Sequence, residues 1–201
     1  MTQVHYTGQS PAFGALQGGV SIEQKSTIAI DLKTDKLWIA WADGRNNIRG
    51  FGSSTNKYAY SDILFMTSSD GGQTWTRASA VSPVRNIFPG ARRDQFNPTL
   101  AVDQTGTVAI CYYDRRNDRN NFSADRYCSI TTNNGLTWQD QRKTADVFLM
   151  EPYVDAITFN GSAPVGTFDG TTTDYLRNRA GFIDAFTIVN SGNADVYAAR
   201  F

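Results

Sequence analysis

The sequence SSDGGQTW at residues 68–75 recurs as TTNNGLTW at residues 131–138. Both octapeptides fit the pattern Ser/Thr-x-Asp/Asn-x-Gly-x-Thr-Trp, and they lie 63 residues apart. Glycine at the fifth position permits a backbone conformation closed to other residues, while the Asp or Asn side chain accepts hydrogen bonds from turn amides. The tryptophan then covers apolar surface where the next strand begins. The octapeptides predict equivalent turns in two copies of one structural unit.

Two further blocks repeat upstream, in the same order. WADGRN at 41–46 matches YYDRRN at 112–117 with an offset of 71, and TIAID at 27–31 matches TLAVD at 99–103 with an offset of 72. The octapeptides are offset by 63 residues and the preceding blocks by 71. The first repeat therefore has eight additional residues in the loop after Arg45. Three matched blocks in one order predict tandem repeats.

The apolar residues of each repeat alternate with period two between Gly, Asn and Asp, which indicates β-strands. We expect strands at 26–31, 36–42, 62–68 and 75–82 in the first repeat, and at 98–103, 107–113, 125–131 and 138–147 in the second. Each repeat is therefore predicted to be a four-stranded antiparallel meander.

A third, weaker repeat lacks the octapeptide. Its expected strands are 153–159, 163–168, 181–189 and 194–201, and the last two form a hairpin across 190–193. An alternative aligns 195–197 with 125–127 and leaves this unit without an outer strand, which residues 3–7 would then supply.

The octapeptides resemble the Asp box of the sialidase superfamily, also called the BNR repeat. DQFNP at 94–98 and DRRND at 114–118 also resemble bacterial sialidase-like proteins, and the resemblance covers residues 26–201. It implies an all-β fold of β-propeller blades, about three of a six-bladed ring and apparently a C-terminal half. We expect one partial propeller unit over 1–201, with blades at about 20–84, 85–150 and 151–201. The structural Asp-box residues are Ser68, Asp70, Gly72, Thr74, Trp75, Thr131, Asn133, Gly135, Thr137 and Trp138.

An open half-ring exposes an apolar flank that soluble monomers rarely tolerate. The sequence therefore predicts a homo-oligomer, with two three-blade halves closing a six-blade ring as the favoured form. A different chain, or sequence outside these residues, would cover the flank equally well.

Loops after the second and fourth strands of a meander gather at one rim, and the octapeptides gather at the other. Arginine forks pair bidentately with carboxylates, so arginines at the first rim suit an acidic sugar. The candidate substrate-binding residues, chosen because they do not repeat between blades, are Arg92, Arg93, Asp94, Glu151, Tyr153, Tyr175 and Arg177. Solvated loop charges are the alternative for each of them.

Residues that recur at this rim are expected to have structural roles. Asp43 and Asp114 directly follow equivalent strands and are predicted to cap turns, while Arg45 and Arg116 brace the loops. Calcium binding by Asp114, Asp118 and Asp125 is the alternative, which the three basic side chains in the same loop disfavour.

The amino-acid composition argues against several classes of function. Lys plus Arg and Asp plus Glu each total 19, so no net charge attracts nucleic acid. A single histidine, His5, excludes a Ser-His-Asp enzyme or a multi-histidine zinc site within this chain, and we predict neither cofactor nor metal. No apolar run approaches the roughly 20 residues of a membrane span, and no signal peptide is present. The family resemblance favours an extracellular or secreted protein.

Sialidases use an arginine cluster for the substrate carboxylate, a Tyr nucleophile paired with a Glu, and an Asp acid/base. Their Phe/Tyr-Arg-Ile/Leu-Pro segment has no match here, since VRNIFP at 84–89 departs from it. The catalytic residues are therefore unassigned. We predict a sialidase-like glycan-recognising propeller, either part of an exo-sialidase-type glycoside hydrolase or a descendant that retains binding without turnover. The alternative is a non-catalytic structural or protein-interaction propeller that assembles from half-rings.

The two cysteines are expected to face each other. If Asp114 pairs with Asp125 across the second and third strands of the second repeat, Cys111 and Cys128 pair as well. The same register places Ala40 opposite Phe65. Cross-strand Cβ atoms are about 4.5 to 5.5 Å apart, slightly wide for a relaxed disulfide. We therefore expect two buried free thiols, with a disulfide as the alternative.

Overall fold

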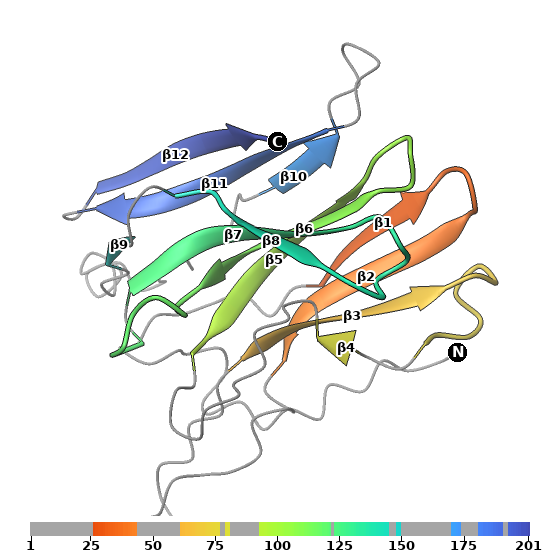
Figure 1. Cartoon of the computed structure of the whole chain (residues 1–201), viewed down its shortest axis with the longest axis horizontal. Helices are drawn as coiled ribbons and strands as arrows, with labels where there is room; N and C mark the ends of the chain where they lie inside the picture. Colours follow the sequence, from red (N-terminus) through yellow and green to blue (C-terminus); the bar gives the residue numbers. More distant parts are fainter. Residues whose placement is uncertain are drawn as a thin grey trace, which may run out of the picture.

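The fold of the chain consists of antiparallel β-sheets (Figure 1). The computed structural model describes residues 26–43, 61–76, 79–80, 93–121, 123–144, 148–149, 170–173, 181–190 and 193–201. Within these ranges there is no helix, so none that could cross a membrane. The expected all-β class and antiparallel pairing are confirmed, while closure into a propeller ring stays a prediction.

Three sheets contain the strands. The first sheet has the order β1 (Thr27–Asp31), β2 (Lys36–Asp43), β3 (Asp62–Ser68) and β4 (Ser79–Ala80). The second sheet has the order β5 (Gln95–Val102), β6 (Val108–Asp114), β7 (Ser123–Thr131) and β8 (Gln139–Arg142), and β9 (Phe148–Leu149) also pairs with β7. The third sheet has the order β10 (Gly170–Thr173), β11 (Phe182–Asn190) and β12 (Asn193–Arg200).

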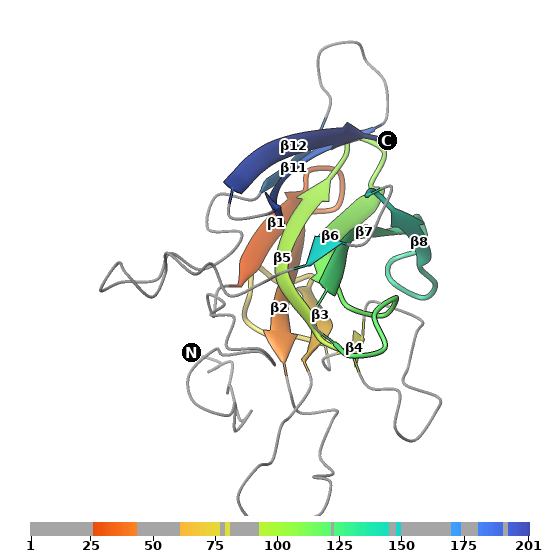
Figure 2. The same ribbon diagram turned by 90° about the vertical axis from the view of Figure 1, so that its left-hand side faces the viewer.

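The sheets pack face to face, and the second lies between the other two (Figure 2). Trp38 and Phe65 of the first sheet pack against Leu100 and Ile110 of the second. On the other face of the second sheet, Tyr113 packs with Phe186 of the third. Alternate residues of β5 and β6 therefore point to opposite neighbouring sheets, which explains why both strands, including their polar residues, are buried along their whole length.

The predicted register of the first two repeats is confirmed. Ala40 pairs with Phe65, and Asp114 pairs with Asp125. The strand predicted at 62–68 has those bounds. The strand predicted at 138–147 is shorter, because β8 ends at Arg142 and the chain then returns to pair β9 with the start of β7.

The third sheet differs from the first-choice prediction. The strand that pairs with β11 is β10, at 170–173, in a segment expected to be a loop. The expected strands at 153–159 and 163–168 lie outside the described residues. β10, β11 and β12 follow one another as first, second and third strands, which is the alternative alignment without an outer strand. The short GTTT sequence of β10 has no apolar alternation by which it could be predicted.

The predicted pairing of the two cysteines across neighbouring strands is confirmed, but the prediction that they are free thiols is wrong. Cys111 and Cys128 pair directly across β6 and β7 and form a disulfide, with both side chains buried. Their Cα atoms lie 3.9 Å apart, closer than the 4.5 to 5.5 Å typical of facing strand residues. This close approach removes the gap on which the free-thiol expectation rested.

The two octapeptide turns, at 68–75 and 131–138 and called the box turns below, form as predicted. Gly72 and Gly135 have φ angles of 88° and 81°. Asp70 accepts hydrogen bonds from the Thr74 amide, and Asn133 accepts one from the Thr137 amide. The hydroxyl oxygens of Ser68 and Thr131 accept the amides of Gly72 and Gly135, so two side chains close each box turn.

Asp70 makes the first box turn sensitive to acid. Hydrogen bonds from the side chain and amide of Thr74, and from Ser68, lower the pKa of Asp70 from 3.8 to about 2. The unfolded carboxyl protonates first as pH falls, so this stabilisation is complete above pH 3.8 and is lost towards pH 2.

We therefore expect Asp70→Asn to weaken the acid dependence of stability across this interval, because an amide fills the same place in the second turn. Urea unfolding at pH values on either side of the interval measures it. Asn133→Asp is the matched control and should strengthen the acid dependence. Equal pH slopes in Asp70→Asn and the parent would contradict the assignment.

Candidate functional site

The rim opposite the box turns contains those candidate residues that the structure describes. Arg93 is partly exposed, and Asp94 is buried directly before β5. Arg92, Glu151, Tyr153, Tyr175 and Arg177 lie outside the described residues. The described part of the predicted site consists of Asp94 and the β6–β7 loop. It is called the β5–β6 rim below.

Asp94 joins the first sheet to the second. Its carboxylate accepts hydrogen bonds from the Ser61 amide at 3.1 Å and from Asn121 Nδ2 at 2.6 Å. The Asn121 side chain also accepts a bond from the Asp94 amide at 2.8 Å, so the two residues clasp each other. Burial raises the pKa of Asp94, and the charge of Arg115 opposes that rise. Asp94 thus positions the rim.

Arg115 is a buried cation behind this carboxylate. Its Nη1 atom donates to the Asn121 carbonyl at 2.7 Å and lies 3.4 Å from Asp94 Oδ2. Burial lowers the pKa of Arg115, and Asp94 acts in the opposite direction. The guanidinium also stands 5.6 Å from the centre of the Phe96 ring. The repeat places Arg115 at this rim but predicts no individual role for it, because its buried partners are set by the fold.

Asp114 caps the β6–β7 turn, as its repeated position predicted. One of its oxygens accepts the Arg116 amide at 2.6 Å, and the other accepts Gln95 Nε2 at 2.6 Å. Asp43, the equivalent residue of the first sheet, accepts Trp41 Nε1 at 2.7 Å. Both aspartates are completely buried, and their described contacts are structural.

Arg116 braces the loop, as predicted, by contacting two carboxylates. It lies 2.6 Å from Asp114 Oδ2 and 2.6 Å from Asp140 Oδ2, and it covers the Tyr127 ring at 4.1 Å. Burial acts to lower the pKa of Arg116, but the contributions of Asp114, Tyr112 and Asp140 together outweigh it, so the net shift is upward. Arg45, the repeat equivalent, lies outside the described residues.

The three aspartates considered for calcium have separate partners. Asp125 accepts Arg142 Nη2 at 2.6 Å and Thr144 Oγ1 at 2.8 Å, while Asp118 accepts the amides of Asn120 and Ser123. With Asp114 engaged by Arg116, each of the three carboxylates is bonded to protein donors. These contacts make the loop between β6 and β7 a fixed element of the rim.

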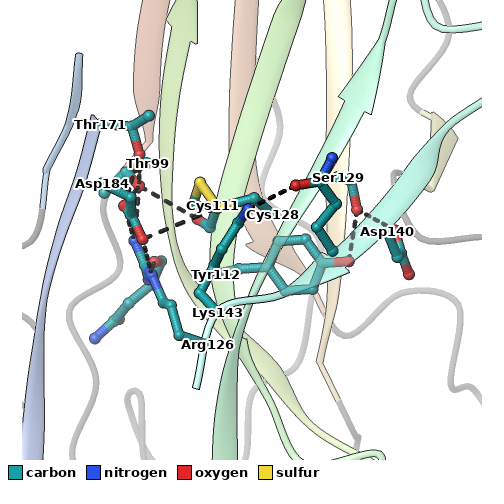
Figure 3. The surroundings of a disulfide bond; sticks show 12 residues. Thr99, Cys111, Tyr112, Arg126, Cys128, Ser129, Asp140, Lys143, Thr171 and Asp184 are labelled. Carbon is teal, nitrogen blue, oxygen red and sulfur yellow. Dashed lines mark hydrogen bonds and ion pairs between the residues drawn. A yellow bond between two sulfur atoms is a disulfide. The ribbon is translucent and has the colours of Figure 1, made fainter. Parts of the chain in front are cut away.

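A second polar cluster lies between the second and third sheets, away from the rim. Arg126 of β7 donates from Nε and Nη2 to the two oxygens of Asp184 on β11, both at 2.8 Å, and both side chains are fully buried. Thr99 and Thr171 also hydrogen bond to Asp184 (Figure 3). This cluster ties the third sheet to the second.

The disulfide adjoins the same cluster. Cys111, Cys128 and Asp184 place potential ligand atoms within 4.8 Å of one another. Both sulfurs belong to the disulfide, so neither offers a thiolate to a metal. The 4.0 Å approach of Cys128 Sγ to Asp184 Oδ2 is a packing contact, because a disulfide sulfur has no proton to donate. The described chemistry of this cluster is therefore structural.

The stacked antiparallel sheets define an all-β class of protein, and some solved structures have a similar fold. No family model matches the chain, and no curated protein matches it. Among solved structures, Zg3597, a family 117 glycoside hydrolase from the marine bacterium Zobellia galactanivorans, is similar with a TM-score of 0.50 and 13% identity. The match covers 96% of this chain and 55% of that one.

Two further structures are similar. A protein of unknown function from Dyadobacter fermentans has a TM-score of 0.50 and 12% identity, over 90% of this chain and 52% of that one. A mutant of NanB sialidase from Streptococcus pneumoniae has a TM-score of 0.48 and 11% identity, over 85% of this chain and 20% of that one. The chain thus spans about half or less of these proteins. At such identities the likeness concerns the fold.

Proposed function

We propose that the protein is a sialidase-like, glycan-recognising propeller protein that binds an acidic carbohydrate at the β5–β6 rim. The observation that carries the proposal is the fixed framework of Asp94, Arg115 and Asn121, which holds the start of β5 and the β6–β7 loop together beside Arg93. A framework of buried ionic bonds keeps neighbouring side chains in one arrangement, which lowers the entropic cost of binding a polar ligand.

The chemistry of the exposed rim agrees with an acidic sugar. Arg93 and Arg119 reach solvent at this end of the sheets, and guanidinium groups recognise a carboxylate through paired hydrogen bonds. Asn120 is also exposed there and has an amide group of the kind that binds sugar hydroxyls. The structurally similar Zg3597 is a glycoside hydrolase, which supports a carbohydrate ligand by analogy of fold alone.

The test is binding of sialylated glycans by the Arg92→Ala/Arg93→Ala variant. We expect a loss of most of the binding and little change in the melting temperature, because a partly exposed charge such as that of Arg93 adds little stability. Lys33→Ala is the control, since Lys33 is an exposed cation in the β1–β2 turn at the other rim. Unchanged binding by the double variant, or no binding by the parent protein, would contradict the proposal.

A non-catalytic assembly protein built from half-rings is the second candidate. The observation that favours it is an exposed apolar face on β1, where Ile28 and Ile30 are 61% and 43% exposed. Measuring the mass in solution separates this candidate from a glycan-binding monomer.

A further inference from the structure

The exposed face of β1 corresponds, position for position, to a buried face in the next repeat. The repeat offset of 72 aligns Ile28 with Leu100 and Ile30 with Val102. Leu100 and Val102 are 6% and 8% exposed, because the first sheet covers them. Ile28 and Ile30 are 61% and 43% exposed, because no described sheet covers the face of β1 on which they lie. The same apolar positions are thus kept in both repeats and covered in one.

The neighbouring strand extends this face. Ile28 pairs with Ile39 and Ile30 pairs with Leu37, so the four side chains lie on one side of β1 and β2. Leu37 and Ile39 are partly exposed, whereas Val108 and Ile110, their repeat equivalents, are almost completely buried. The face formed by Ile28, Ile30, Leu37 and Ile39 is called the β1 face below.

The opposite end of the stack has an outer face of its own. Asp184 and Phe186 on β11 point to the second sheet, so Ile183 and Ala185 point away from it. On β12, Val196 and Ala198 pair with outward residues and are exposed, Val196 by 77%. The face formed by Ile183, Ala185, Val196 and Ala198 is called the β12 face below.

We propose that the β1 face docks on the β12 face of a second copy of this chain. The three sheets already stack in one direction, each covering the apolar face of the next, so the same packing applied between copies covers both outer faces. Two head-to-tail contacts would close the stack into a two-fold dimer. The length agrees, since the chain spans 55% and 52% of the two similar proteins with TM-scores of 0.50. This inference is independent of the carbohydrate proposal.

The first test is the mass of the 201-residue chain in solution by light scattering. We expect twice the single-chain mass of 22.2 kDa. Ile28→Asp/Ile30→Asp should be monomeric, because the contact would bury two unpaired carboxylates. Both positions are exposed within one copy, so the variant should keep the circular dichroism of the parent. Leu136→Asp is the matched control: Leu136 is 83% exposed in the second box turn, and its replacement should leave the dimer intact.

The second test decides which faces meet. Val196→Asp/Ala198→Asp should also be monomeric. A mixture of this variant with Ile28→Asp/Ile30→Asp should recover a dimer, because one of its two contacts then joins an unaltered β1 face to an unaltered β12 face. A β1-to-β1 contact would instead leave Val196→Asp/Ala198→Asp dimeric, and this result would overturn the proposal. A monomeric parent, whose β1 face a different polypeptide would then cover, would overturn it as well.

Discussion

Asp184→Ala should lower the free energy of unfolding by about 3 to 5 kcal/mol, the cost of leaving one partner of a buried ion pair uncompensated. Asp184 accepts both forks of Arg126, and neither side chain reaches solvent. The stranded guanidinium would retain two neutral acceptors, Thr99 Oγ1 and the Asn97 carbonyl. Urea unfolding at neutral pH, with the slope checked for constancy, measures the loss.

A double substitution separates the charge from the packing. Arg126→Met/Asp184→Leu removes both charges together and should cost much less than the sum of the single changes, since apolar replacements of buried pairs are often tolerated. Arg142→Met is the control for an ion pair with a partly exposed cation and should cost about 1 kcal/mol or less. A small loss in Asp184→Ala, comparable to that control, would show that the pair contributes little.

Repeat spacing carried most of the fold prediction. Offsets between the matched blocks fixed where strands begin, and one assumed pair at Asp114 and Asp125 fixed the whole register of β6 and β7. Local chemistry was sufficient at the box turns, because positive φ and an oxygen acceptor are needed there whatever surrounds them. Such features are visible in sequence because their cause lies within a few residues.

The missed features have their causes elsewhere in the chain. Arg126 and Asp184 are 58 residues apart, and the residues next to each of them do not indicate a buried partner. β10 is a strand because β11 offers it a paired edge, not because GTTT favours one strongly. The disulfide depended on how closely β6 and β7 approach, which register alone does not specify. Each of these features depends on contacts between residues that are far apart in the chain. Such contacts cannot be predicted from a single sequence where the repeats do not match.

The two box glycines should respond differently to the same substitution. Gly72 and Gly135 both have positive φ, so alanine at either costs about 1 kcal/mol in backbone strain. A Cβ atom at Gly72 would meet its nearest neighbours at 3.6 and 3.7 Å, which is ordinary contact. At Gly135 it would stand 2.7 Å from Cζ of Phe65 in the first sheet. The second box turn is thus part of the contact between sheets.

Gly135→Ala should therefore cost about 2 to 4 kcal/mol, since the usual 1 to 3 kcal/mol of overpacking adds to the strain. Phe65 has little freedom to move, because its ring stacks on Trp38 at 5.6 Å and meets the edge of Trp138 at 5.2 Å. Gly72→Ala is the matched control, and unfolding curves of the two variants give the difference. Phe65→Leu should recover part of the loss when combined with Gly135→Ala, because the shorter side chain vacates the space the methyl group needs. Equal losses at the two glycines would mean that the clash is relieved without cost and that the second box turn does not hold the first sheet in place.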